Sequence, residues 1–439
     1  MTNLLSTGTQ EPSKIISPEL KFGVSFSELY HRDGLLKLDQ VFLEFLQNGD
    51  AALRVRLDQA RLNPDALAQK DDSLLLIDLA PWVEDFIGQL FGIEKEVRGL
   101  AAKHHELAPL YFCKRQFVQR RAKTKVSDEV LLTINGIALE KELEVEFGES
   151  FSELVFANHV ANWLEDEANN TIRIEKALHY AAWALRTQEG QKHTQAGILF
   201  KFPAKLDHLH LLSLSTDKQK GFPLHRLDHF RYREGFSLTD SGTDLVGALD
   251  EANYCIWCHE QGKDSCSKGF VQKPKNSEEL PSFKKSELGA LLAGCPLEER
   301  ISEFHKLKTQ GHAIGSLAMI VLDNPMCAGT GHRICNDCMK SCIYQKQTPV
   351  NIPQAETRTL KDVLELPWGF EIYSLLTRWN PLDLRRPLPK AATGKKVLVV
   401  GMGPAGYTLA HHLMNDGHTV VGIDGLKIEP LPKEIVVLI

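Results

Sequence analysis

The stretch of sequence that decides the fold begins with CIWCHEQGKDSC (residues 255–266), passes through CP (295–296) and ends with CAGTGHRICNDCMKSC (327–342). Eight of the nine cysteines of the chain fall in this stretch, and the ninth, Cys113, stands alone in the N-terminal half. Thiols that serve only as small core residues would not cluster in this way. The spacing therefore indicates a metal or iron–sulfur site.

Two kinds of metal chemistry fit these thiols. The C-x2-C pairs Cys255/Cys258 and Cys335/Cys338 can each direct two thiolates at one centre, and Cys295 is followed by proline, as in ferredoxin-like sites. Zinc is the alternative, because two tetrahedral sites would use all eight thiols. A redox C-x-x-C of the thioredoxin type is disfavoured, since no βαβ pattern precedes either pair. The spacing favours iron–sulfur clusters and leaves zinc open.

A second motif lies near the C-terminus. An apolar strand at 395–400 runs into Gly401-Met-Gly403-Pro-Ala-Gly406, and a helix and a second strand at 418–424 follow. This is G-x-G-x-x-G in the strand–turn–helix–strand context that dinucleotide binding requires. Gly401 permits the turn, Gly403 lets the backbone approach a pyrophosphate, and Gly406 lets the helix pack on the strand. The predicted cofactor-binding residues are Gly401, Gly403, Pro404, Ala405, Gly406 and, for the ribose, Asp424.

Composition narrows the class of protein. The 439 residues are 43% hydrophobic and 25% charged, which is typical of a globular protein, and the net charge is −6. The chain has no excess of basic residues, which a nucleic-acid-binding protein would be expected to have. The N-terminus lacks the pattern of a secretory signal, and no apolar run approaches the roughly 20 residues that cross a bilayer. We expect a cytoplasmic protein without a membrane span, where clustered thiols bind metal more often than they form disulfides.

The spacing of apolar residues divides the rest of the chain into helical and loop-rich segments. Residues 1–24 show no periodicity and read as a flexible lead-in, whereas 35–61, 82–104, 151–163 and 172–185 carry helical apolar spacing. Residues 191–240 are rich in Pro, Gly and His and predict an exposed loop. Six side chains in this loop could in principle bind a metal: Asp207, His208, His210, His225, Asp228 and His229. Nothing fixes the spacing between them, so exposed polar residues are the favoured interpretation.

The order of these segments resembles a known module. The cysteine groups are followed by TPVNIPQAE (348–356), a proline-containing linker and VLVVGMGPAGYTLAHHL (397–413). Residues 250–425 resemble the N-terminal iron–sulfur and FAD-binding region of the glutamate synthase small subunit and of dihydropyrimidine dehydrogenase. In that family a helical domain holds two [4Fe-4S] clusters and an FAD domain follows.

The resemblance implies a partition of the ligands. Cys255, Cys258, Cys266 and Cys342 would hold the first cluster, and Cys295, Cys335, Cys338 and Glu356 the second. This sequence departs from the family in three places: seven residues separate Cys258 from Cys266, Cys295 lies 29 residues beyond Cys266, and Cys327 is an additional thiol that could replace Glu356.

We therefore predict a mainly α N-terminal region, an α-helical double [4Fe-4S] domain and the incomplete start of a Rossmann-type α/β domain. The predicted boundaries are a lead-in at 1–24, a helical domain at 25–245, the iron–sulfur domain at 246–380, a linker at 381–394 and the opening βαβ unit of an FAD domain at 395–439. The chain reads as the front of a longer protein.

The predicted function is that of an FAD-dependent oxidoreductase, or of its electron-transfer portion. It would pass electrons between FAD and the clusters and on to an acceptor protein or C-terminal domain, with NAD(P)H bound outside this segment. We predict no acid–base catalytic residue, because the cofactors supply the chemistry. The alternative is a zinc-stabilised interaction module fused to a nucleotide-binding domain.

Overall fold

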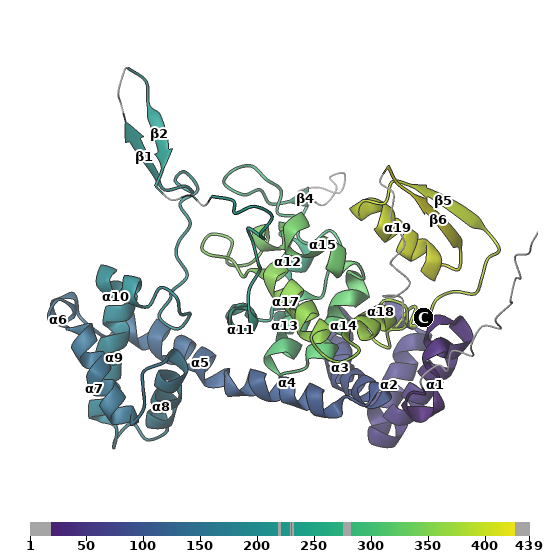
Figure 1. Cartoon of the computed structure of the whole chain (residues 1–439), viewed down its shortest axis with the longest axis horizontal. Coiled ribbons are helices and arrows are strands. Elements are labelled where there is room, and N and C mark those ends of the chain that lie inside the picture. Colours follow the sequence, from purple (N-terminus) through teal and green to yellow (C-terminus); the bar gives the residue numbers. More distant parts are fainter. Residues whose placement is uncertain (1–18, 218–220, 229, 231, 275–281, 426–439) are drawn as a thin grey trace, which may run out of the picture.

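The computed structural model describes residues 19–217, 221–228, 230, 232–274 and 282–425. These residues are mainly helical, with three small two-stranded sheets among them (Figure 1). None of the helices among them is both long enough and apolar enough to cross a membrane.

The N-terminal helices follow the predicted periodicity, with shifted boundaries. They are α1 (Arg32–Gly49), α2 (Ala51–Leu62), α3 (Gln69–Phe91) and α4 (Glu94–Glu106). Asp50 separates α1 from α2 because its carboxylate accepts the Leu53 N–H at 2.9 Å and caps the second helix. The single helix expected at 82–104 is two helices, because Gly92 adopts a left-handed φ of 68° and ends α3.

The predicted lead-in is ordered from residue 19 onward. Val24 is fully buried, and the Phe22 ring stacks on Phe86 of α3 with centroids 5.1 Å apart. Residues 1–18 lie outside the described part of the chain.

A second group of helices lies at the far end of α4, to the left in Figure 1. It comprises α5 (Ala108–Cys113), a π-helix (Lys114–Ala122), α6 (Asp128–Leu131), α7 (Gly136–Phe147), α8 (Glu153–Glu165), α9 (Thr171–Arg186) and α10 (Gln188–His193). The predicted helices at 151–163 and 172–185 correspond to α8 and α9. Asn135 and Ser152 cap α7 and α8, so local sequence sets these boundaries.

Residues 191–193 of the predicted loop at 191–240 belong to α10, whereas the described residues between 201 and 244 form a mostly exposed, loop-rich segment. It carries one antiparallel hairpin, β1 (Leu214–Asp217) with β2 (Leu224–Leu227). Its polar side chains pair locally: His210 with Asp207 at 2.8 Å, Asp228 with Ser213 at 2.6 Å, and His225 with Thr216 at 3.0 Å. His208 faces Glu287 at 3.9 Å, and His229 lies outside the described residues. Local pairing, without convergence on a common point, agrees with the exposed-loop interpretation.

The cysteine region is a set of short helices joined by loops. Its elements are α11 (Leu245–Tyr254), a 3-10 turn (Cys258–Gln261), α12 (Ser265–Lys268), β3 (Val271–Gln272), β4 (Ser282–Phe283), α13 (Ile301–Thr309), α14 (Ala313–Asp323), α15 (Cys327–Ile334), α16 (Asp337–Lys340), α17 (Ile352–Leu364) and α18 (Gly369–Leu376). The strands β3 and β4 pair antiparallel.

The buried cores do not follow the predicted boundary at 245. Buried residues from 24–97 and from 255–384 form one core, and residues 110–200 with Leu249 form a second. Helices α3 and α14 make the junction of the first core. Glu84 of α3 accepts the N–H groups of Ile314 and Gly315 at 2.7 and 3.2 Å, so one helix caps the other. The periodicity of apolar residues predicts a buried stripe on α3 but does not predict which helix packs against it.

The C-terminal segment has the predicted order of elements. Strand β5 (Lys396–Val400) pairs parallel with β6 (Thr419–Ile423), and α19 (Pro404–Asn415) connects them. Residues 426–439 lie outside the described part of the chain, so the rest of the predicted Rossmann-type domain stays a prediction.

The half-buried Glu251 of α11 makes folding depend on pH. Its carboxylate accepts the backbone N–H of Asn351, the N-cap of α17, at 2.7 Å. Burial raises the pKa of Glu251 to about 7. The folded state therefore holds this proton more tightly than the unfolded state, and stability falls as pH rises from about 4.5 to about 7.

We predict that Glu251→Gln raises the free energy of unfolding at pH 8 by roughly 2 kcal/mol, because the amide keeps the hydrogen bond without a buried charge. At pH 4.5 the variant and the wild type should be equally stable. Urea denaturation at both pH values measures the effect. The exposed Glu106→Gln is the control, and an equal shift in both variants would contradict the assignment.

Candidate metal centres and dinucleotide site

Four of the predicted ligands meet at one cavity, which we call the first cysteine site: Cys255, Cys258, Cys266 and Cys342. Cys255 follows α11, Cys258 opens the 3-10 turn, Cys266 lies in α12 and Cys342 follows α16. Trp257 adopts a left-handed φ of 51° and reverses the chain between the first two thiols. The walls between the sulfurs are apolar, with Ile301 and Ile352 among them.

Burial dominates the acid–base chemistry of this site. It raises the pKa of the Cys258 thiol to about 11 and the pKa values of Cys255 and Cys266 further. Burial also raises the pKa of Cys342 above its ordinary value. Each thiol also lies close enough to another for their mutual repulsion to disfavour ionisation. Thiolates are the species that bind metal, so binding here releases protons and compensates the buried negative charge.

A hydrogen-bonded network lies behind the first cysteine site. The Cys266 thiol donates to Asp264 at 2.9 Å, and Ser302 of α13 lies 3.4 Å from the same carboxylate and 2.6 Å from His259 Nδ1. Glu303 then accepts from Ser73 of α3 at 2.6 Å. The network fixes the loop that carries Cys258 and Cys266 to the helical core, as outer-shell groups do around metal ligands.

A second group of thiols, the second cysteine site, lies between α14, α15 and α17. It comprises Cys295, Cys327, Cys338, Glu299 and Glu356. Burial, followed by the neighbouring Glu299 carboxylate, raises the pKa of Cys295 to about 12, and burial raises that of Glu299 to about 7. Asn324, at the end of α14, donates to Glu356 at 3.0 Å.

Two features of the second cysteine site differ from the expected ligand set. Cys335 is exposed and lies beside Asp337 and Lys340, whereas the additional thiol Cys327 is buried with Cys295 and Cys338. Glu299 was not anticipated from the sequence. Its position four residues after Cys295 would have been the only signal, because a turn after Cys-Pro returns that side chain toward the thiol, at 3.8 Å.

Among the residues that the structure describes, no three or more His, Cys, Asp or Glu side chains form a group that could hold a single metal ion. The four thiols of the first cysteine site line one cavity and are not such a group.

The glycine turn after β5 has the geometry that its sequence predicts. Gly401 has φ 90°, and a Cβ on Gly406 would lie 1.8 Å from the Gly401 carbonyl oxygen, so both positions require glycine. A Cβ on Gly403 would meet no atom within 4 Å, which leaves the backbone at the start of α19 open to a ligand. The Asp424 carboxylate accepts the Met402 N–H at 2.5 Å and so lies at this turn.

The first turn of α19 packs against the second cysteine site. The Tyr407 hydroxyl is buried without a hydrogen-bond partner, and a Cβ on Gly329 of α15 would lie 2.5 Å from it. Tyr373 of α18 donates to the Pro325 carbonyl at 2.7 Å and lies beside both Cys327 and Tyr407. The glycine turn and the second cysteine site are therefore neighbours.

Comparison with known proteins places the chain in a family. Residues 20–92 match the model of the RP005 N-terminal alpha-helical domain. The protein RP005 of Rickettsia prowazekii (strain Madrid E) is 33% identical over 300 residues, which cover 66% of this chain and 99% of RP005. The chain belongs to the RP005 family. The matched domain model corresponds to α1–α3, the N-terminal part of the first core in this RP005-family chain.

Two other similarities are shorter. RP006 of the same organism is 61% identical over 110 residues, or 25% of this chain and 16% of RP006. The glutamate synthase [NADPH] small chain of Bacillus subtilis (strain 168) is 33% identical over 137 residues, or 31% of this chain and 24% of that protein. The chain thus spans a quarter or less of these two proteins. Part of this RP005-family chain is distantly similar to an oxidoreductase subunit.

Cys327 is buried and Cys335 is exposed, so we expect their substitution to have different effects on metal binding. Cys327→Ser should lower the metal bound per chain, because it removes a buried thiol of the second cysteine site, and Cys335→Ser should leave most of it. Elemental analysis of anaerobically purified variants measures both. Cys113→Ser, a buried thiol in the second core, is the control. A loss confined to Cys335→Ser would contradict this assignment.

Proposed function

We propose that this chain is the electron-transfer part of an iron–sulfur flavoprotein, in which the first cysteine site holds a [4Fe-4S] cluster. The observation that carries the proposal is the meeting of four thiols around one apolar cavity, three of them buried and Cys258 half-buried. They come from segments up to 87 residues apart. Four cysteine thiolates are the standard ligand set of such a cluster. The distant similarity to the glutamate synthase small chain supports the same chemistry.

The residues of the second cysteine site fit a second cluster of mixed ligands. Cys295, Cys327 and Cys338 would supply thiolates, and Glu356 or Glu299 a carboxylate. Two buried carboxyls beside three thiols cannot all be ionised without a cation, and burial raises the pKa of Glu356 well above its ordinary value. A cationic metal centre would compensate this charge.

The glycine turn supports dinucleotide binding, and the resemblance to the glutamate synthase small subunit leads us to propose FAD. Gly403 and the N–H groups that open α19 would hold the pyrophosphate, and Asp424 would accept from a ribose hydroxyl. When bound, FAD and the clusters supply the electron transfer, and the chain fixes their positions and surroundings. Tyr407 and Tyr373 bring the turn and the second cysteine site into contact, which keeps the path between the two groups short.

We propose that NAD(P)H is the electron donor, bound outside this segment of the protein, in line with the similarity to the glutamate synthase [NADPH] small chain. The acceptor would be a partner protein or a further domain. Reduced thiols at this density suit the cytoplasm, where disulfides are rare.

Anaerobically purified protein should contain iron and acid-labile sulfide in equal amounts and absorb broadly in the visible range. Cys255→Ser should lose roughly half of the iron, because one of two sites loses a ligand. Cys113→Ser should keep all of it, since that thiol lies in the other core. Stoichiometric zinc without iron would sink the proposal and favour the zinc-stabilised module.

The glycine turn gives a matched pair of variants for flavin binding. Gly403→Val should abolish FAD binding without unfolding the segment, because the added side chain points into the open space that the pyrophosphate would occupy. Gly406→Ala should instead destabilise the segment, because its Cβ meets the Gly401 carbonyl. Flavin fluorescence after heat release, together with circular dichroism, separates the two effects. Wild-type FAD occupancy in Gly403→Val would refute the phosphate assignment.

A further inference from the structure

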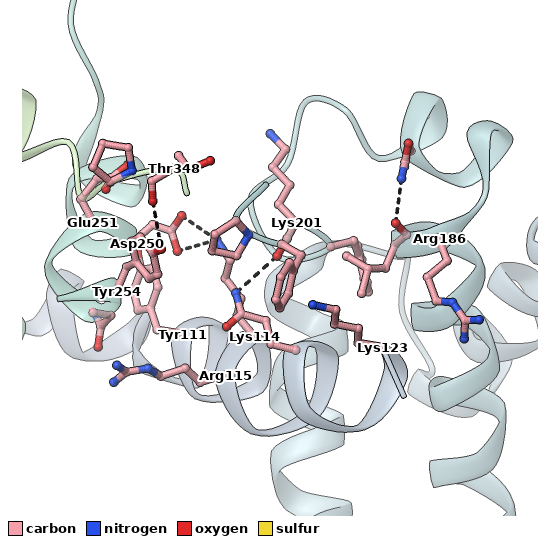
Figure 2. A pocket seen from close by; sticks show the side chains of 18 residues that line it. Tyr111, Lys114, Arg115, Lys123, Arg186, Lys201, Asp250, Glu251, Tyr254 and Thr348 are labelled. Carbon is pink, nitrogen blue, oxygen red and sulfur yellow. Dashed lines mark hydrogen bonds and ion pairs between the residues drawn. The ribbon is translucent and has the colours of Figure 1, made fainter. Parts of the chain in front are cut away.

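A cavity among the described residues lies away from the cysteine sites and the glycine turn. It has a volume of about 560 Å³, within the range of small-molecule sites. Its walls come from the π-helix at 114–122, from the segment 200–203 and from α11, so it lies where the two cores of the molecule meet (Figure 2). Neither the similarity to glutamate synthase nor the motifs account for it.

Positive charge dominates the lining. Five cations border the cavity, namely Lys114, Arg115, Lys123, Arg186 and Lys201, against two carboxylates, Asp250 and Glu251. Both carboxylates have partners within the protein: Asp250 binds Lys114 at 2.6 Å, and Glu251 accepts the Asn351 N–H. Figure 2 shows this pair of carboxylates at one side of the cavity and Arg186 at the other.

Part of the positive charge is uncompensated. Arg186 is paired with Asp128. The side chains of Arg115 and Lys201 have no hydrogen-bond or ion-pair partner among the residues that the structure describes, although the Lys201 carbonyl accepts from Gln119 at 3.4 Å. The Lys123 ammonium lies 3.0 Å from the centroid of the Phe202 ring. It has no carboxylate partner among the described residues. A half-buried guanidinium without a counterion is costly, and two oxygens of a carboxylate or phosphate group would satisfy its donors in pairs.

The π-helix presents these groups on one side. Arg115, Gln119 and Lys123 follow at intervals of four residues, and all three line the cavity. Arg120 belongs to the same helix, is exposed and does not line it. π-Helical turns are rare and are frequently found at functional sites.

One wall of the cavity approaches the first cysteine site. Tyr254 lines the cavity and directly precedes Cys255. Its ring stacks on Tyr344, with centroids 4.6 Å apart and an interplanar angle of 7°, and Tyr344 lines the first cysteine site. The stacked rings of Tyr254 and Tyr344 therefore connect the cavity to the first cysteine site.

We propose that this cavity binds a small organic oxyanion, a carboxylate or a phosphate ester, through Arg115 and Lys123. Apolar contacts with Phe200 and Phe202 would hold the rest of the ligand. The proposal goes beyond the electron-transfer function and does not depend on it, because its residues are neither thiols nor part of the glycine turn.

Isothermal titration calorimetry on the full chain tests the proposal, with inorganic phosphate and glutarate as probes. At least one probe should bind to the wild type with a Kd below about 10 mM, and Arg115→Gln should weaken it about tenfold or more, the loss expected for a charge-assisted hydrogen bond. Tighter phosphate binding would indicate a phosphate ester, and tighter glutarate binding a carboxylic acid.

The matched control is Arg120→Gln, which removes the same charge from the same helix outside the cavity and should change the Kd by less than about twofold. Lys123→Gln, at an exposed position, provides a second test should Arg115→Gln fail to fold by circular dichroism. The proposal is overturned if neither probe binds to the wild type, or if Arg120→Gln weakens binding as much as the cavity variants do.

Discussion

The structure around the cysteines depends on helix α14, which has no polar face. Residues Ala313–Val321 are all buried, so the helix is stable only when other helices surround it on every side. Helices α3, α13, α17 and α18 provide that cover. Glu84 caps its N-terminal N–H groups, and Asn324 at its other end binds Glu356. The second cysteine site is thus built on the end of the most deeply buried helix.

Buried charges fix the helices around α14. Lys308 of α13 and Asp362 of α17 are both fully buried and pair at 2.7 Å. Arg300 binds Asp323 at 2.6 Å and Asp72 of α3 at 3.0 Å. Losing one member of such a pair costs about 3–5 kcal/mol, because the other charge is left uncompensated. These pairs allow few alternative arrangements of the helices, and so they hold the ligand-bearing loops in one position.

The sequence predicted the local features well and the long-range ones poorly. The helices, the glycine turn and the meeting of Cys255, Cys258, Cys266 and Cys342 follow from spacing and from the resemblance to a family. The packing of α3 against α14 could not be predicted, because an apolar stripe shows that a helix is buried but not which helix packs against it. The proximity of Cys327 and Glu299 to Cys295, and the cavity beside Arg115, likewise arise from contacts between segments far apart in the sequence.

The burial of the thiols also protects them. A thiol reacts with oxidants and alkylating agents only as the thiolate, and burial keeps the four thiols of the first cysteine site protonated at neutral pH. These four cysteines are therefore protected against disulfide formation. Cys335 is exposed and less protected, so among the nine cysteines it is the one that we expect peroxide to oxidise first.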